Sequence, residues 1–361
     1  MEPTSRRQQA EQALLHAWFP VARSIDLGQP QAATLLGEKL VVYRTAAGTP
    51  VVQSRRCPHR GADLSQGTVI KDDIACPYHG WRFSAESGAC SFIPSLTDQT
   101  RIPPRAEVKT YPAVERFEHV WTVLDEPTYP MYDPPDWRDL HLKSAAATPI
   151  PASTGVAAAM ENFRDVAHFP FVHAVSMGEM PEVVERLVVD RDGVNIAMDR
   201  PLIAADGDWM VNGDCMMRYR CIAPGFASVI YDYERLGRRL LGVFPSPSSY
   251  ESVLLFCVVA VGKGFQGTSL KDCVRFEEAV TWEDVAVVGK LDPPEVPWDE
   301  ERIEVSVPAD AFTLNYRAAF WTFVRRTREL IHDNPDGSSA HQHATRNLHP
   351  PRNRNASPST D

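Results

Sequence analysis

Two cysteines and two histidines share one short stretch of the chain, "CPHRGADLSQGTVIKDDIACPYHGW". Cys57 and His59 form a C-x-H pair, and after sixteen intervening residues Cys76 and His79 form a C-x-x-H pair. Both side chains of one pair can reach a common centre, and the residues between the pairs suffice for a hairpin that brings the two loops together. Core cysteines and surface histidines would explain any one of these residues, but not four in register. The pattern therefore predicts a metal centre with thiolate and imidazole ligands.

Two kinds of centre use these four ligands. A structural zinc of the Cys2His2 type usually takes both cysteines from one pair and both histidines from the other. A Rieske [2Fe–2S] cluster instead has two thiolates on one iron and two neutral imidazoles on the other, which raises its reduction potential. Because each loop here supplies one cysteine and one histidine, the spacing favours the cluster over zinc.

A second group of polar residues lies in "MENFRDVAHFPFVHA", residues 160–174. On a helix, Asp165 and His168 are three residues apart and share a face, with Asn162 one turn earlier. Pro170 would bend the helix and turn His173 toward the same centre. Two histidines and a carboxylate form the facial triad that holds Fe(II) in non-heme oxygenases. Two histidines near a helix end can also be coincidence, so the rest of the chain must decide.

The two stretches resemble a known family. The segments "CPHRGADLSQG" and "CPYHGWRF" are similar to the Rieske domain of the Rieske non-heme iron oxygenases, and "NFRDVAHFPFVH" is similar to the iron-site motif of the same family. The resemblance spans about residues 18–327. Within the family, the chain looks most like the compact one-chain vanillate O-demethylases, caffeine-type N-demethylases and saxitoxin-pathway hydroxylases. It implies an α+β fold, with an N-terminal all-β Rieske domain and a C-terminal helix-grip-like antiparallel sheet with flanking helices.

The resemblance assigns a role to each residue of the first stretch. It implies that Cys57 and Cys76 bind one iron of the cluster, and that His59 and His79 bind the other. Pro58 and Pro77 would stiffen the two loops, so that backbone N–H groups point at the cluster sulfurs. Gly61 and Gly80 would permit a close backbone approach, and Trp81 would shield the cluster from solvent.

The resemblance also extends to the second stretch. It implies that His168 and His173 bind the mononuclear iron, that Asp165 is an electron bridge, and that Asn162 is a nearby polar residue. The third ligand is expected in "FEEAVTWEDVAVVGKLDP", which is similar to the C-terminal helix of the family. There Asp284 is the choice, because Glu283 is expected on a different helix face and Asp292 is close to a helix-ending proline. The apolar "VAVVG" after Asp284 departs from the family pattern and puts the helix register in question.

The family resemblance further implies a reaction. Electrons would pass from NAD(P)H through a separate reductase, with or without a ferredoxin, to the [2Fe–2S] cluster and then to Fe(II). Dioxygen would be used to hydroxylate a C–H bond of a small aromatic or heterocyclic substrate, as a monooxygenase or an O- or N-demethylase. The cluster of one subunit would serve the iron of the next in a homotrimer, with Asp165 bridging the partner subunit's His79 and its own His168. A dihydroxylating dioxygenase and a non-catalytic electron carrier or sensor are the alternatives.

Hydrophobic patterning divides the chain into two domains and a tail. A short helix at 11–19 precedes strands and hairpins over 33–126, and the proline-rich segment 127–137 marks a boundary. We expect a Rieske domain with the N-terminal helix over 1–135, a catalytic domain over 136–332 and a disordered tail over 333–361. In the second domain we expect helices at 156–166, 271–291 and 308–331, and five strands. The expected strands are 184–190, 215–222, 227–234, 238–244 and 253–261.

Composition limits the partners. With 47 acidic and 37 basic residues the formal net charge is −10, which disfavours nucleic acid. The start of the chain lacks the apolar core of a secretory signal, and the longest apolar run, 253–261, is too short to cross a membrane. Seven cysteines, an odd number, argue against a disulfide framework. We therefore expect a cytoplasmic enzyme with reduced thiols.

The substrate pocket is harder to read from the pattern. Residues on strand and helix faces of the second domain are the candidates, and each apolar one has core packing as its alternative. The candidates are Asn212, Met216, Phe226, Phe256 and Trp282.

Overall fold

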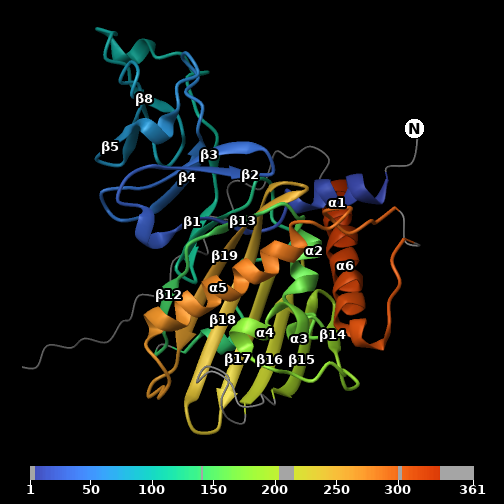
Figure 1. Ribbon diagram of the computed structural model, residues 1–361. Coiled ribbons are helices and arrows are strands. Elements are labelled where there is room, and N and C mark those ends of the chain that lie inside the picture. The colour runs from blue at the N-terminus through green and yellow to red at the C-terminus, as the bar shows by residue number, and fades with distance from the viewer. Residues whose placement is uncertain (1–4, 140, 203–214, 300–302, 334–361) are drawn as a thin grey trace, which may run out of the picture.

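The computed structural model of the protein describes residues 5–139, 141–202, 215–299 and 303–333. The N-terminal strands form three short antiparallel sheets in one lobe (Figure 1). One has the order β2-β3-β4-β9 and comprises β2 (Gln31–Leu35), β3 (Glu38–Arg44), β4 (Pro50–Ser54) and β9 (Thr110–Tyr111). A second comprises β5 (Thr68–Ile70), β6 (Asp73–Ala75), β7 (Arg82–Phe83) and β8 (Cys90–Phe92) in that order. The third, β1-β11-β10, comprises β1 (Phe19–Arg23), β10 (Ala113–Arg116) and β11 (His119–Thr122). These sheets confirm the expected all-β domain.

One large antiparallel sheet forms the second lobe, in the order β12-β19-β18-β17-β16-β15-β14, with β13 also paired to β19. Its strands are β12 (Lys143–Ala146), β13 (Ile150–Ala152), β14 (Asp190–Asp192), β15 (Asn195–Leu202), β16 (Cys215–Ile222), β17 (Phe226–Tyr233), β18 (Gly237–Ser249) and β19 (Ser252–Val261). Its helices are α2 (Val156–Asn162), α3 (Phe169–Val172), α4 (Ala174–Met177), α5 (Leu270–Val288) and α6 (Ala311–Asp333). The 3-10 turns of the chain are at Ser24–Asp26, Leu64–Gln66, Gln99–Arg101, Pro135–Trp137 and Pro308–Asp310. The predicted α+β class with an antiparallel sheet and flanking helices is confirmed.

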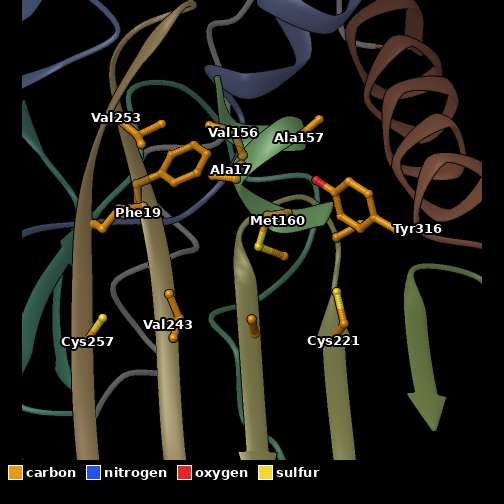
Figure 2. Close-up of a cluster of buried hydrophobic side chains, with 14 of the residues drawn as sticks. Ala17, Phe19, Val156, Ala157, Met160, Cys221, Val243, Val253, Cys257 and Tyr316 are labelled. Atoms are coloured by element: carbon orange, nitrogen blue, oxygen red, sulfur yellow. The ribbon is translucent and has the colours of Figure 1, made fainter. Parts of the chain in front are cut away.

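The two faces of this sheet have different neighbours because successive side chains on a strand alternate. Met217, Ala227 and Cys257 lie on the face that packs against the helices. Figure 2 shows this core, in which Met160 of α2 lies beside the strands and near Tyr316 of α6. The neighbouring residues in each strand point to the opposite face, toward the N-terminal lobe. A shift of one residue along a strand therefore moves a side chain from one face to the other.

Helix α5 carries Asp284, the expected third iron ligand. The sequence of α5 explains how the helix is placed against the sheet. The Ser269 hydroxyl accepts a hydrogen bond from the Asp272 backbone N–H and caps the helix. Its buried positions recur every three or four residues, which presents one stripe to the sheet. These positions are Cys273, Glu277, Val280, Thr281, Asp284 and Val288. Asp284 is thus a polar residue within a buried stripe.

A buried carboxylate caps α2, the helix that leads into the second polar stretch. Both oxygens of Glu295 accept hydrogen bonds from the first turn of α2, at 3.0 Å from the N–H groups of Ala157 and Ala158. A Cβ atom on Gly155 would lie 2.1 Å from a Glu295 oxygen, so the close approach requires glycine. Burial raises the pKa of Glu295 to about 7, despite hydrogen bonds that favour the charged form.

Several expected elements are corrected. The N-terminal helix is α1 (Arg6–Leu14), capped by Ser5, rather than 11–19. It packs against α6, and its buried residues share one core with the large sheet and with β2 and β3. The run 184–190 forms no strand before β14, and its Val188 is 71% exposed, since no neighbouring strand pairs with it. The expected tail, apart from Asp333, lies outside the described residues.

The two later helices lie close to their expected bounds. Helix α5 covers Leu270–Val288 where 271–291 was expected, and α6 covers Ala311–Asp333 where 308–331 was expected. Among the helices within the described ranges, none is both long enough and apolar enough to cross a membrane.

Candidate active site

The first polar stretch folds into two loops with the same backbone hydrogen bonds. In one, the Cys57 N–H donates to the carbonyl of Ala62, and the Gly61 N–H donates to the carbonyl of Cys57, both at 2.9 Å. In the other, the Cys76 N–H donates to Trp81 at 2.8 Å, and the Gly80 N–H donates to Cys76 at 3.0 Å. The two glycines have φ of +76° and +69°, a conformation that residues with a Cβ rarely adopt. Each cysteine therefore begins a turn that closes four and five residues later.

The four side chains form a pair of thiols and a pair of imidazoles, and each pair contains one residue from each loop. Cys57 and Cys76 are both buried, and burial, followed by the Cys76 thiol, raises the pKa of Cys57 to about 11. The rings of His59 and His79 are 4.6 Å apart between centroids. Trp81 stacks on His59 at 4.4 Å, with an interplanar angle of 8°. Thiol thus faces thiol and imidazole faces imidazole, although each pair draws one member from each loop.

This arrangement fits a two-iron cluster better than a single ion. Among the described residues, these four side chains do not form a group whose ligand atoms all lie within 4.8 Å of one another, as a single zinc would require. No disulfide joins Cys57 and Cys76. Nδ1 of His59 is buried without a hydrogen-bond partner, which a ligand nitrogen would resolve. The residues present can therefore hold a [2Fe–2S] cluster between the thiol pair and the imidazole pair.

The second polar stretch is not one helix. Helix α2 ends at Asn162, Asp165 lies in the following turn, and His168 directly precedes α3. Pro170 occupies the first turn of α3, where its missing N–H costs nothing, and His173 joins α3 to α4. The expected contact between Asp165 and His168 exists, but a turn produces it instead of the predicted helix face.

Three ligand atoms meet between α5 and the segment that carries α3 and α4. Nε2 of His168 and Nε2 of His173 are 3.1 Å apart, and they lie 3.3 and 3.2 Å from Oδ1 of Asp284. Ligands about 2.1 Å from a metal and at right angles to each other are separated by about 3 Å. Within the described ranges, this is the one group of three or more His, Cys, Asp or Glu residues with all ligand atoms inside 4.8 Å. The predicted triad is assembled, and its spacing fits one ion with open coordination positions.

Electrostatics at the triad favour a positive charge. Burial opposes protonation of His168, but hydrogen bonds to Asp165 and Asp284 outweigh it and raise the pKa of His168 to about 9. Burial likewise opposes ionisation of Asp284, and contacts with both histidines still lower the pKa of Asp284. A cation placed between these groups therefore meets a negative, largely buried environment.

Each histidine has a carboxylate on its other ring nitrogen. Nδ1 of His168 lies 3.2 Å from Oδ2 of Asp165, and Nδ1 of His173 lies 2.8 Å from Oε2 of Glu283. An ionised carboxylate only accepts hydrogen bonds, so both Nδ1 atoms carry a proton, while both Nε2 atoms face Asp284, where a bound metal ion would take the place of a proton. Asn162 donates from Nδ2 to Oδ1 of Asp284 at 3.3 Å, while its own Oδ1 is buried without a partner.

The predicted pocket residues do not gather at the triad. Phe226 and Phe256 lie on the opposite face of the sheet, in a cluster with Trp121 of β11. Met216 of β16 is 36% exposed, and Trp282 of α5 is 53% exposed. Asn212 lies outside the described residues. The reason is strand alternation: the adjacent residues Met217, Ala227 and Cys257 face the helices instead.

Two polar features near the triad were not predicted. Glu283 was expected to face away, yet its longer side chain reaches His173. Arg239 of β18 forms a fully buried ion pair with Glu277, which lies two turns before Asp284 on the same stripe of α5. Glu277 had a sequence signal, a charged residue at the spacing of a buried helix face, whereas Glu283 lies off that stripe and had none.

The two centres lie far apart within one chain. The sheet β5-β6-β7-β8, which carries the second cysteine loop, is at one end of the molecule, and α3 and α4 are near the other end of the large sheet (Figure 1). Tyr78, beside His79, is 66% exposed, and so are Phe171 (68%) and Val175 (94%) beside the triad. Both centres therefore lie next to exposed apolar or aromatic side chains.

Comparisons with known proteins agree with these two centres. The Rieske [2Fe-2S] domain family matches residues 17–112, and the vanillate O-demethylase oxygenase C-terminal domain family matches residues 153–325. The methylxanthine N3-demethylase NdmB of Pseudomonas putida is 29% identical over 333 residues, which cover 84% of this chain and 88% of NdmB. The methylxanthine N1-demethylase NdmA of Pseudomonas putida is 29% identical over 347 residues, which cover 92% of this chain and 93% of NdmA.

Two further likenesses complete the comparison. The oxidoreductase NdmD of Pseudomonas putida is 36% identical over 115 residues, which are 31% of this chain and 19% of NdmD. The solved structure of NdmA from Pseudomonas putida CBB5 with caffeine has a TM-score of 0.74 and 25% identity, and covers 88% of this chain and 96% of that one. With both domains matched in order over most of its length, the chain belongs to the Rieske non-heme iron oxygenases, enzymes that use a [2Fe–2S] cluster, a mononuclear iron and dioxygen.

Proposed function

We propose that the protein hydroxylates a methyl or ring C–H bond of a small aromatic or heterocyclic molecule, and that attack on an N- or O-methyl group leads to demethylation. The observation that carries this proposal is the triad of His168, His173 and Asp284, which faces the interior beside α5. The family match and the relatives named as methylxanthine N-demethylases support it.

Each centre has its own residues. Cys57 and Cys76 would hold one iron of the cluster, and His59 and His79 the other. The triad would hold the mononuclear Fe(II). When bound, the cluster supplies single electrons and the Fe(II) activates dioxygen for insertion into a C–H bond.

The side chains around the triad hold protons and orient the ligands. Asp165 keeps the proton of His168 on Nδ1, and Asn162 fixes the Asp284 carboxylate. Because the triad is largely buried, water is kept from the reacting centre once substrate fills the space beside it.

A homotrimer would bring the two kinds of centre together. Since the cysteine loops and the triad lie at opposite ends of the folded subunit, an electron route within one subunit would be long (Figure 1). If the Rieske loops of one subunit cover Phe171 and Val175 of the next, the partner subunit's His79 can approach Asp165 and complete a short route. The exposed apolar side chains at both places support this arrangement.

A separate reductase would deliver the electrons from NAD(P)H. The likeness to part of the oxidoreductase NdmD supports a partner of the oxidoreductase class. Whether a ferredoxin stands between the reductase and the oxygenase depends on that partner. All seven cysteines are free thiols, which supports a reducing compartment such as the cytoplasm, where NAD(P)H is available.

Demethylation and hydroxylation begin with the same step. One oxygen atom enters the C–H bond and the other leaves as water, with two electrons and two protons consumed. When the hydroxylated carbon is a methyl group on nitrogen or oxygen, the C–N or C–O bond then breaks and formaldehyde is released. Elsewhere the alcohol is stable.

A single-turnover experiment tests the proposal. The chemically reduced, iron-loaded protein is mixed without oxygen with methylxanthines or methoxybenzoates, exposed to ¹⁸O₂ and quenched for mass spectrometry and a formaldehyde assay. Product carrying one ¹⁸O atom, or demethylated product with matching formaldehyde, supports the proposal. The His168→Ala variant is the control. Equal product from that variant would refute the triad assignment, and no product from any substrate of either class would refute the proposed substrate range.

A further inference from the structure

Glu283 lies at the triad without any role in the proposed function. Its Oε2 is 2.8 Å from Nδ1 of His173, and the Ser176 hydroxyl donates to the same oxygen at 2.7 Å. The carboxylate is therefore held by two donors. His173 itself is buried, with only 1% of its surface exposed.

Three separate elements supply these groups. His173 lies between α3 and α4, Ser176 belongs to α4, and Glu283 comes from α5, 110 residues away from His173. Asp284 follows Glu283 on α5 and approaches the opposite edge of the same ring, with Oδ1 at 3.2 Å from Nε2. Two consecutive acidic residues thus contact the two nitrogens of one imidazole.

We infer that Glu283 is a positioning residue for His173, anchored by Ser176, and that it does for this ligand what Asp165 does for His168. The inference rests on the proposed triad. A carboxylate on Nδ1 fixes the tautomer and the ring orientation of a metal-binding histidine and increases its basicity. The contact to His173 is shorter than the 3.2 Å contact between Asp165 and His168. The site therefore has one supporting carboxylate for each histidine, but only Glu283 lies on the same helix as the third ligand.

The position of Glu283 on α5 also couples it to Asp284. Because α5 presents both Glu283 and Asp284, a small rotation of that helix would disturb the support of His173 and the carboxylate ligand together. Removal of the Glu283 carboxylate leaves Nδ1 of His173 without its acceptor, while Nε2 still faces Asp284. The ring can then turn or change tautomer, and either change weakens its bond to iron.

The test is anaerobic Fe(II) titration of protein whose mononuclear site has been emptied with a chelator. Glu283→Ala is expected to bind Fe(II) about 10- to 100-fold more weakly than the unchanged protein. Glu283→Gln keeps an oxygen acceptor for Nδ1–H and is expected to recover most of that loss. Ser176→Ala is expected to fall between the unchanged protein and Glu283→Ala. Asp292→Asn, an exposed acid after α5, is the matched charge control.

Two further readouts separate positioning from a structural role. Cluster absorbance and thermal unfolding report whether each variant is folded, and Co(II) absorption bands report the ligand geometry at the site. An affinity for Glu283→Ala within twofold of the unchanged protein, with unchanged Co(II) bands, would overturn the inference. If Glu283→Ala does not fold, Ser176→Ala decides: unchanged Fe(II) affinity there would also overturn it. Retention of iron by His168→Ala would instead reject the triad, which distinguishes the two failures.

Discussion

Replacement of Asp284 by Asn tests the charge balance of the triad. The substitution keeps the size of a side chain that is 4% exposed, but removes the negative charge whose Oδ1 lies 3.2 and 3.3 Å from the two histidines. Hydrogen bonds to Asp165 and Asp284 raise the pKa of His168 from 6.5 to about 9 against the effect of burial. That rise corresponds to about 3 kcal/mol in favour of a unit positive charge at the ring.

The magnitude for Fe(II) follows from this value. Because the rise of about 3 kcal/mol remains after burial has opposed it, the two carboxylates together contribute more than this. A divalent ion also interacts with the Asp284 charge more strongly than a single positive charge does, so we expect the substitution to cost Fe(II) on the order of 3 kcal/mol. This is a loss of about 100-fold in affinity. Chelator competition without oxygen measures the affinity, and visible absorbance checks that the cluster persists. A loss below threefold in a folded, cluster-containing variant would show that another carboxylate is the third ligand.

Three other outcomes are expected. Asp165→Asn should retain the cluster and the mononuclear iron but reoxidise the reduced cluster about 100-fold more slowly with substrate and oxygen; stopped-flow absorbance that matches the unchanged protein would reject the bridge. Cys76→Ser should lose the cluster absorbance and still bind Fe(II) at the triad, whereas loss of both would mean that the centres do not form independently. Burial raises the pKa of Glu295 to about 7, so its stabilising effect is present below about pH 4.5 and is lost as the pH rises through 7. The Tm of Glu295→Gln should therefore improve relative to the unchanged protein between pH 5.5 and 8, and a pH-independent difference would contradict this.

The cysteine loops were the most predictable part of the site because their geometry is local. Each loop closes through hydrogen bonds within five residues, and each needs a glycine with positive φ at a fixed position after the cysteine. The spacing of Cys57, His59, Cys76 and His79 therefore indicated a cluster before any fold was considered. The contact between Asp165 and His168 was also local, although a turn forms it instead of a helix.

Other parts of the site depended on contacts between distant segments. Asp284 could be proposed from its place in the helix pattern, but its meeting with the two histidines depends on how α5 packs over the sheet. The role of Glu283 was missed for the same reason, since its reach to His173 depends on side-chain length and helix position together. The predicted pocket residues Phe226 and Phe256 lie on the face of the sheet away from the triad, because a shift of one residue along a strand moves a side chain to the other face.

The amino-acid sequence predicts the chemistry of this protein through two local motifs, whose ligand types indicate a [2Fe–2S] cluster and a mononuclear iron. Other features depend on contacts between segments that are distant in sequence. These contacts pack α1 against α6, place Phe226 and Phe256 away from the triad, and leave the two centres at opposite ends of the molecule. The physical reason is that ligand pairs close in sequence are fixed by turns, whereas the faces and distances between elements are fixed by burial of apolar surface across the whole fold.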